Sequence, residues 1–264
     1  MTGRVTFVGA GPGAADLITV RGADALRAAD VVVWAASLVH PDVLGYARPG
    51  ADIVDSAELT LEDCVDIYRR AGAGGRHVVR LHSGDPALWG ALQEQLDACA
   101  ALGVPTEVVP GVSAFSALAA HAQRELTVPR VAQSVVLTRL GGGKTPMPDG
   151  ESIAGFARHG ATMAVFLSAA RARQLVDELR AGGYPEDTPV LIGYRVSWPD
   201  ELVLRCTVGT LAETVREHRL WKHTLFLVGA ALGAAGTRSH LYHPGHFHGF
   251  RRADPVARKA LRDG

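Results

Sequence analysis

The residues His77-Val78-Val79-Arg80-Leu81, followed by His82-Ser83-Gly84-Asp85-Pro86, decide the fold class. The first five are mostly β-branched or apolar and predict a short strand, and Gly-Asp-Pro is a turn sequence. Apolar residues then recur at spacings of three and four, which predicts a helix with one apolar face: Leu88, Leu92, Leu96, Cys99 and Leu102. This order places bare backbone and one carboxylate at the carboxyl edge of a sheet, where ligands of open α/β sheets bind. An ordinary βα turn explains the same residues, so this turn alone does not establish a site.

Two further glycine turns follow predicted strands. Residues 5–8 lead into Gly9-Ala10-Gly11-Pro12-Gly13, and residues 106–109 lead into Pro110-Gly111-Val112-Ser113. Together with Gly-Asp-Pro, these turns predict one trough at the sheet edge. Such a trough suits a ligand with a ribose and an amino-acid moiety, because Asp85 can accept from hydroxyls and nearby backbone groups can bind polar ends.

The rest of the chain predicts two α/β domains. In the first half, strands including 31–34 alternate with helices over 16–29, 61–71 (opened by a Thr60-x-x-Asp63 capping box) and 115–122, which predicts a mostly parallel sheet. In the second half, strands over 135–138, 163–167, 190–193, 202–207 and 223–228 and helices over 169–180 and 211–217 predict a mixed sheet. We expect an N-terminal domain over 1–123, a C-terminal domain over 131–252, a ligand trough between them, and a frayed basic tail over 253–264.

Composition and charge exclude several classes of protein. Hydrophobic residues make up 47% and charged residues 20% of the 264, which is typical of a globular chain. The 27 basic and 27 acidic residues cancel, so no overall field attracts nucleic acid or a membrane surface. The cysteines Cys64, Cys99 and Cys206 are scattered and form no C-x-x-C motif. We therefore expect a soluble cytoplasmic protein without a disulfide framework.

The first glycine turn also satisfies the G-x-G-x-x-A pattern of dinucleotide-binding folds. Two features count against a dinucleotide-binding oxidoreductase. Pro12 has no N–H to offer and delays the helix that such folds start at once. The second strand ends in Trp34-Ala35-Ala36, without the acidic residue that holds the ribose. This class remains an alternative at this point.

The three turns, in this order, resemble those of the tetrapyrrole methylases. Five further stretches resemble the branch of that family that methylates precorrin-4 at C11. They are Ala36-Ser37-Leu38-Val39, the pair Leu137-Thr138-Arg139 and Gly143-Lys144-Thr145-Pro146-Met147-Pro148, and the pair Phe226-Leu227-Val228-Gly229 and Arg238-Ser239-His240-Leu241-Tyr242-His243-Pro244. The resemblance covers nearly the whole chain. Methylation of another position on a related precorrin or cobalt-precorrin is the alternative within the family.

The resemblance implies S-adenosylmethionine as cofactor, S-adenosylhomocysteine as product, a tetrapyrrole as the small-molecule substrate, and a homodimer. By position in the family's motifs, it implies these cofactor-binding residues: Pro12, Ser83, Gly84, Asp85, Leu88, Ser113, Ala114, Leu167, Tyr194, Val196 and Thr224. Without the resemblance, Leu167 and Val196 would be read as plain core residues.

The implied substrate is a large ring fringed with acetates and propionates, which basic side chains can bind. Candidates in loops or near strand ends are Arg139, Lys144, Arg195, Arg238 and His240, although each alone also reads as a solvated surface residue. The loop around Lys144 can act as a flap over the ring. Four histidines crowd residues 240–248, but Pro244-Gly245 interrupts any helix that would align them, so we predict no metal site.

Methyl transfer of this kind needs no nucleophilic side chain, because a ring carbon attacks the sulfonium methyl group. The protein's main task is alignment. His82 and Asp85 are weak candidates for a base that removes a ring proton, and the sequence does not select between them.

Overall fold

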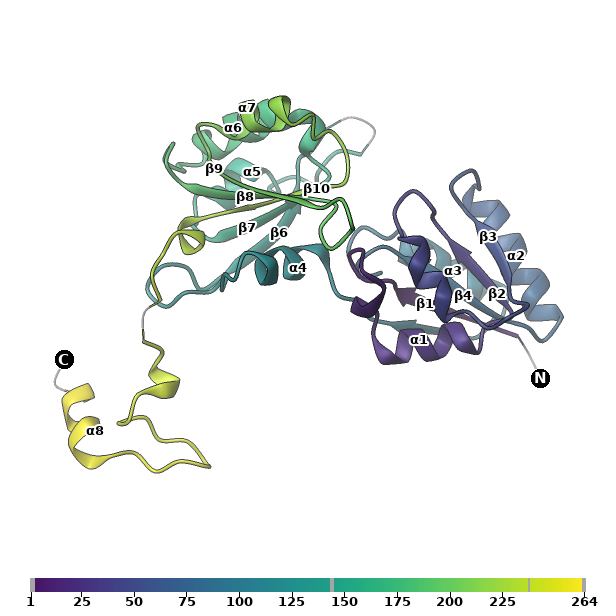
Figure 1. Ribbon diagram of the computed structural model, residues 1–264, viewed down its shortest axis with the longest axis horizontal. Helices are drawn as coiled ribbons and strands as arrows, with labels where there is room; N and C mark the ends of the chain where they lie inside the picture. The colour runs from purple at the N-terminus through teal and green to yellow at the C-terminus, as the bar shows by residue number, and fades with distance from the viewer. Residues whose placement is uncertain (1–2, 143–144, 237, 263–264) are drawn as a thin grey trace. The chain divides into compact units, whose positions relative to one another are not determined.

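The computed structural model describes residues 3–142, 145–236 and 238–262 (Figure 1). They form two compact units, each assembled from separate stretches of chain. The first unit comprises the residues up to Gln123 with Leu191–Leu204 and His218–Leu225; the second comprises Arg124–Val190, Arg205–Glu217 and the residues from Phe226 onward.

The first unit contains a parallel sheet. Its strands are β1 (Arg4–Gly9), β2 (Val31–Trp34), β3 (Asp52–Asp55), β4 (His77–His82) and β5 (Thr106–Val109), in the spatial order β3-β2-β4-β1-β5. Every pairing in this sheet is parallel, which confirms the prediction for this half. The sequence analysis missed β3, a short edge strand whose Asp52 and Ile53 are exposed and which therefore lacks an apolar face.

Helices cover both faces of this sheet. On one face, α1 (Val20–Arg27) packs over a core that includes Val8, Val32 and Val79. On the other face, α2 (Leu61–Ala73) and α3 (Leu92–Ala101) pack over Phe7, Val33 and Val78. The side chains of consecutive β4 residues thus point into the cores on opposite faces of the sheet, because side chains alternate between the two faces along a strand.

Helix starts differ from the prediction in two places. The predicted helix over 16–29 is divided into a 3-10 turn, Ala15–Leu17, and α1, because Thr19 caps α1 by accepting from the Gly22 N–H. Helix α3 starts only at Leu92, because Trp89 and Ala91 have left-handed backbone angles (φ 52° and 48°). The capping box at Thr60 and Asp63 is confirmed, with both hydrogen bonds formed.

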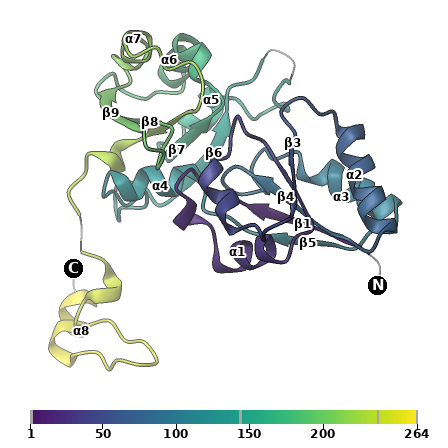
Figure 2. The ribbon, with the colours of Figure 1, turned by 45° about the vertical axis from the view of Figure 1, so that its right-hand side comes forward.

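The other sheet contains β6 (Val135–Arg139), β7 (Thr162–Phe166), β8 (Pro189–Tyr194), β9 (Leu202–Thr207) and β10 (Thr224–Val228), in the order β6-β7-β10-β8-β9. Strand β7 pairs parallel with β6 and antiparallel with β10, so the mixed sheet is confirmed. Within the second unit lie α5 (Ile153–Ala157), which was not predicted, α6 (Ala172–Ala181) and α7 (Leu211–Glu217) (Figure 2). Helix α4 (Ala114–His121) belongs to the first unit.

The prediction of a frayed tail is wrong. Residues Pro255–Arg262 form helix α8. Its first residues favour a helix start, because Asp254 accepts from the Ala257 N–H and proline occupies the first helical position. Arg251 fastens the preceding loop by donating to the carbonyls of Leu241 (2.6 Å) and His243 (3.0 Å). No helix in the described ranges is long and apolar enough to cross a bilayer.

Candidate functional site

The three glycine turns meet at the carboxyl edge of the first sheet. Gly84 N–H donates to the Gly11 carbonyl (2.8 Å) and Gly11 N–H to the Gly84 carbonyl (3.3 Å), which joins the first turn to the second. Asp85 Oδ2 accepts from the Gly111 N–H (2.8 Å), which joins the second turn to the third. The predicted convergence of three turns distant in the chain is therefore confirmed as geometry.

Glycine is required where these turns touch. A Cβ on Gly111 would lie 2.0 Å from the Gly84 carbonyl oxygen, and one on Gly9 would lie 2.4 Å from the Gly111 Cα. Gly84 also has a left-handed backbone (φ +63°), which side chains rarely adopt. The glycines thus let three backbone segments approach more closely than any other residue would allow.

Asp85 braces the turns, a role that the sequence analysis missed. Its Oδ1 accepts from the Ala87 N–H (2.8 Å), while Oδ2 holds Gly111. The spacing from Asp85 to Ala87 is the one sequence signal for this, since an aspartate at the start of a turn often accepts from the backbone two residues on. Each oxygen keeps a free lone pair for a ligand hydroxyl. The roles of Asp85 in cofactor binding and as a base stay predictions.

Helix α4 begins beside Gly84. A Cβ on Gly84 would lie 3.8 Å from the Ser113 Cα and 3.9 Å from the Ala114 nitrogen. Ser113 is the N-cap and is buried, but its side chain makes no capping hydrogen bond. The start of a helix carries partial positive charge and free N–H groups, which favour an anionic ligand group. Ser83 is exposed and Leu88 half-buried around the same turn.

A fourth segment, which the sequence analysis did not single out, locks onto the first turn within the first unit. Ser197 Oγ accepts from the Ala14 N–H (3.0 Å), and Trp198 Nε1 donates to the Pro12 carbonyl (3.0 Å). Predicted site residues Tyr194 (half-buried) and Val196 (buried) lie just before them. The signal available in the sequence was a tryptophan next to a proline, Trp198-Pro199, a few residues after a strand that ends at Tyr194.

Polar contacts hold this segment, defined here as the 195–201 loop. Glu201 accepts from the Ser197 N–H (2.8 Å) and lies 3.1 Å from His121 Nδ1 on α4. Arg195 pairs with Asp200 (3.1 Å), and its guanidinium lies 4.1 Å from the centre of the Trp198 ring. Arg195 is therefore already engaged, and a substrate carboxylate would have to compete with Asp200.

His82 is buried directly before the second turn, with 7% of its surface exposed. Burial, and then the neighbouring Arg80 charge, lower the pKa of His82 to about 4, so the imidazole is neutral near pH 7. Its Nε2 has no hydrogen-bond partner. A role for His82 as a base stays a prediction.

The remaining predicted site residues are divided between the two units, except for Lys144. Thr224 belongs to the first unit, is buried and donates to the Lys222 carbonyl (2.8 Å). The second unit holds Leu167, Arg139, Arg238 and His240. Lys144 lies outside the described residues. Every one of these roles stays a prediction.

The second-unit residues already have local contacts. Leu167 is 69% exposed with a left-handed backbone, so it is not the core residue that composition alone suggested. Arg139 donates to the carbonyls of Leu140, Thr145 and Pro146. Arg238 donates to the Tyr242 carbonyl (3.2 Å), and the His240 ring stacks on His243. Within the described ranges, no three His, Cys, Asp or Glu side chains gather as metal ligands would.

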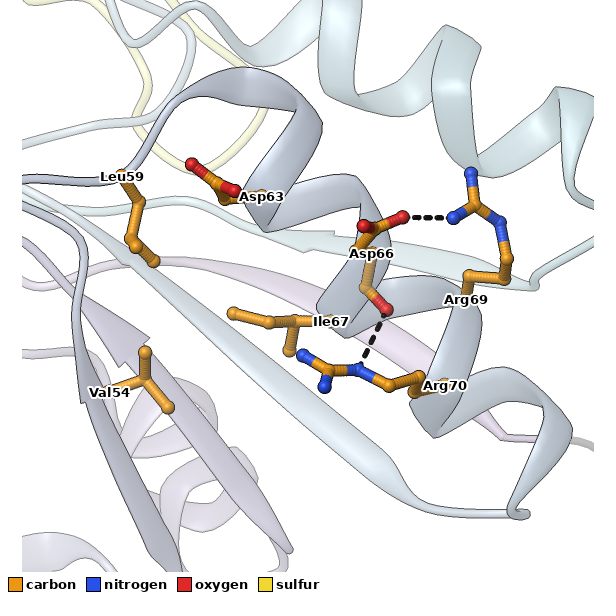
Figure 3. Close-up of a pocket in the computed structure, with 7 residues that line it drawn as sticks. All are labelled: Val54, Leu59, Asp63, Asp66, Ile67, Arg69 and Arg70. Carbon is orange, nitrogen blue, oxygen red and sulfur yellow. Dashed lines mark hydrogen bonds and ion pairs between the residues drawn. The ribbon is translucent and has the colours of Figure 1, made fainter.

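A surface hollow of about 540 Å³ lies away from the turns, between α2 and β3 (Figure 3). Its lining residues are Val54, Leu59, Asp63, Asp66, Ile67, Arg69 and Arg70. Figure 3 shows two interactions in its lining: Arg69 pairs with the Asp66 carboxylate, and Arg70 donates to the Asp66 backbone carbonyl. None of the predicted site residues that the structure describes lines this hollow.

Comparisons with known proteins agree with this geometry. The family model described as "Tetrapyrrole (Corrin/Porphyrin) Methylases" matches residues 4–212. A cobalt-precorrin-4 C(11)-methyltransferase of Methanocaldococcus jannaschii is 41% identical over 251 residues, 95% of this chain and 96% of that protein. A precorrin-4 C(11)-methyltransferase of Mycobacterium tuberculosis is 47% identical over 239 residues, 90% of this chain and 95% of that protein.

Solved structures give the same result. The crystal structure of a cobalt precorrin-4 methyltransferase superposes with a TM-score of 0.84 at 41% identity, covering 87% of this chain and 95% of that one. A Thermus thermophilus uroporphyrin-III C-methyltransferase, solved in complex with S-adenosyl homocysteine, gives a TM-score of 0.72 at 30% identity, covering 87% of this chain and 93% of that one.

Proposed function

The chain belongs to the tetrapyrrole methylases, and we propose that it transfers a methyl group from S-adenosylmethionine to C11 of precorrin-4, giving precorrin-5 in the assembly of the corrin ring of cobalamin. The observation that carries the proposal is the convergence of three glycine turns in a chain 41–47% identical to C11-methyltransferases over at least 90% of its length. The alternative of a dinucleotide-binding oxidoreductase loses its support. The helix after the first turn starts only at Val20, and the family match is to methylases.

The turns fit this cofactor in two ways. The close approach of Gly84 and Gly111 leaves bare backbone at the sheet edge, and the start of α4 favours a carboxylate such as that of the methionine moiety. We therefore assign cofactor contact to the residues predicted above: Pro12, Ser83, Gly84, Asp85, Leu88, Ser113, Ala114, Leu167, Tyr194, Val196 and Thr224. The cofactor supplies an electrophilic methyl group on a sulfonium.

The chain's own residues act by position. The braced turns fix the backbone that faces the cofactor, so that methyl group and acceptor carbon can be aligned before reaction. Alignment of this kind can lower a barrier by about 7–11 kcal/mol. Both carboxylate oxygens of Asp85 accept hydrogen bonds from backbone N–H groups. This arrangement fits a structural role for Asp85 better than a role as the base that accepts a proton.

Basic residues from several loops would hold the substrate's carboxylates. We keep Arg139, Lys144, Arg195, Arg238 and His240 as proposed contacts. Of these, Arg195 forms an ion pair with a carboxylate, that of Asp200. A substrate carboxylate that displaced Asp200 would keep the guanidinium charge neutralised.

The test is a methylation assay. Purified protein is incubated with precorrin-4 and ¹³C-methyl S-adenosylmethionine, and the product is examined by NMR. We expect one new methyl signal, bonded to C11. A label at another ring carbon would instead support the alternative within the family, and no transfer despite cofactor binding would contradict the proposal.

The same assay with cobalt-precorrin-4 addresses the metal content of the substrate. Relatives are named for both substrates, at 47% identity for a metal-free one and 41% for a cobalt one. We propose metal-free precorrin-4 and expect faster turnover with it. Faster turnover of cobalt-precorrin-4 would contradict this choice and identify the cobalt complex as the substrate.

We also propose a cytoplasmic homodimer. The thiols of Cys64, Cys99 and Cys206 are free, as in proteins kept in a reducing compartment. Light scattering on the purified chain should give twice the mass of 27.8 kDa. A monomer at micromolar concentration would contradict the dimer and leave the proposed chemistry untouched.

A further inference from the structure

Two polar side chains of β4 enter the core face covered by α2 and α3. Arg80 and His82 alternate with Val79 and Leu81, which serve the opposite core. Arg80 lies in register with Phe7 of β1 and Val33 of β2, and His82 lies in register with Gly9. Because Gly9 adjoins Gly111, His82 stands directly beside the convergent turns.

Arg80 is a cation without a counter-ion. It is half-buried and donates from Nη1 to Ser56 Oγ (2.6 Å), while its buried Nε has no partner. No carboxylate in the part of the chain that the structure describes forms an ion pair with it. A withdrawn positive charge of this kind is costly unless something compensates it.

His82 adds a second unsatisfied group at the same place. Its Nε2 is buried without a partner, its ring lies 6.0 Å from that of Phe7, and its other nitrogen faces the Gly90 backbone. The core on this face contains three titratable groups, Cys64 and Tyr68 from α2 and Cys99 from α3, and burial raises the pKa of each, which keeps them neutral. The Tyr68 hydroxyl is occupied, since it donates to Gln95 (2.7 Å).

We infer that Arg80 and His82 form a binding site for a carboxylate, which in this enzyme is an acetate or propionate side chain of the tetrapyrrole. The inference rests on the proposed function, which supplies a substrate fringed with such groups beside the turns. The carboxylate would accept from the free side of the Arg80 guanidinium and from His82 Nε2. Its negative charge would also favour protonation of His82, so that Nε2 carries a hydrogen to donate.

The competing explanation is that Arg80 only braces Ser56, whose hydroxyl in turn donates to the Trp34 carbonyl (3.0 Å). Replacement of Arg80 would have different effects under the two explanations. Loss of a brace lowers stability and leaves the KM for the tetrapyrrole unchanged in folded protein, whereas loss of a carboxylate site raises that KM and spares cofactor affinity.

The experiment compares Arg80→Met, Arg80→Lys and His82→Leu with wild type. Arg69→Met, which removes an exposed α2 arginine, is the matched control. For each we would measure the melting temperature, S-adenosylhomocysteine affinity by calorimetry, and kcat and KM for precorrin-4. Arg80→Met should raise KM about 10- to 100-fold, as expected for a lost charge-assisted hydrogen bond, and His82→Leu about 2- to 10-fold. Arg80→Lys should recover part of the loss, and Arg69→Met should match wild type.

Unchanged KM in Arg80→Met overturns the inference. If Arg80→Met does not fold, Arg80→Lys decides, because lysine keeps the positive charge but lacks the two-pronged set of guanidinium donors. A raised KM for precorrin-4 with unchanged cofactor affinity in Arg80→Lys supports the site. A wild-type KM in that variant overturns it. Failure of the wild-type protein to bind S-adenosylhomocysteine would instead overturn the proposed function, so the two failures are distinguishable.

Discussion

At the scale of single residues, Asp85 shows how one side chain can serve both fold and site. Its two oxygens accept from Ala87 and Gly111, so the carboxylate carries the connection between the second and third turns. A Gly-Asp-Pro sequence predicts the turn and its Asp85–Ala87 bond. It cannot predict the bond to Gly111, 26 residues away, because that contact depends on how β4 and β5 flank β1.

Replacement of Asp85 by asparagine should destabilise the protein. Asparagine has a single acceptor oxygen, so one of the two backbone N–H groups would face an amide NH₂. We expect a loss of about 1–3 kcal/mol in the free energy of unfolding, measured with urea. Asp177→Asn, at an aspartate whose side chain is 74% exposed, is the control and should change little. Equal stability of the two variants would contradict the brace.

The burial of His82 predicts a dependence of stability on pH. Its folded-state pKa of about 4 lies below the ordinary value of 6.5, so between these values the unfolded chain binds a proton that the folded chain does not. Stability should therefore fall as pH drops below about 6.5, by about 2 kcal/mol at pH 5 from this residue.

Urea unfolding at pH 7.5 and pH 5 measures this effect. Burial also lowers the pKa of His77 and His223, so wild type loses stability from several groups. The informative quantity is the difference between wild type and His82→Gln, which should lose less on acidification. An identical loss in both proteins would mean that His82 is not buried as a neutral group.

At the scale of elements, the close approach of the glycine turns makes a sharp prediction. Gly111→Ala would place its Cβ 2.0 Å from the Gly84 carbonyl oxygen, and both atoms belong to braced backbone that cannot move aside. We expect the turns to separate, with a loss of at least about 3 kcal/mol in unfolding free energy, in the range that severe local clashes reach. Gly45→Ala, where a Cβ would meet nothing within 4 Å, is the control for the same change.

The 195–201 loop gives the second prediction at this scale. Trp198→Phe removes the hydrogen bond to the Pro12 carbonyl but keeps an aromatic ring beneath Arg195. The first turn should become less fixed, and S-adenosylhomocysteine affinity should fall about 2- to 10-fold, the effect of one ordinary hydrogen bond. Trp221→Phe, at an exposed tryptophan, should leave the affinity unchanged in the same calorimetric titration. Equal affinities would show that the loop does not support the turn.

Sequence patterns predict the elements unequally. Strands such as β1 and β4 have buried apolar residues on both faces, and their runs of valine and leucine reveal them. Edge strand β3 and the short α5 lack a repeated apolar face. The late start of α3 depends on the left-handed backbone of Trp89 and Ala91. The spacing of apolar residues in the sequence does not reveal such backbone angles.

At the scale of the whole molecule, the strand–turn–helix pattern predicted the parallel sheet and the edge where the turns meet. It could not predict that residues Leu191–Leu204 join the first unit, since that depends on Trp198 and Ser197 reaching the first turn across more than 180 residues of chain. The same limit applies to Arg80: a strand pattern places it on one face but does not show that it lacks a counter-ion.

The central claim is that the three convergent turns hold the cofactor. A crystal structure of this protein with S-adenosylhomocysteine tests it most directly. We expect the ligand to lie against the Gly84-Asp85 turn and the Ser113–Ala114 end of α4, with Pro12 in contact. S-adenosylhomocysteine bound elsewhere, for example in the hollow between α2 and β3, with the turns untouched, would contradict it.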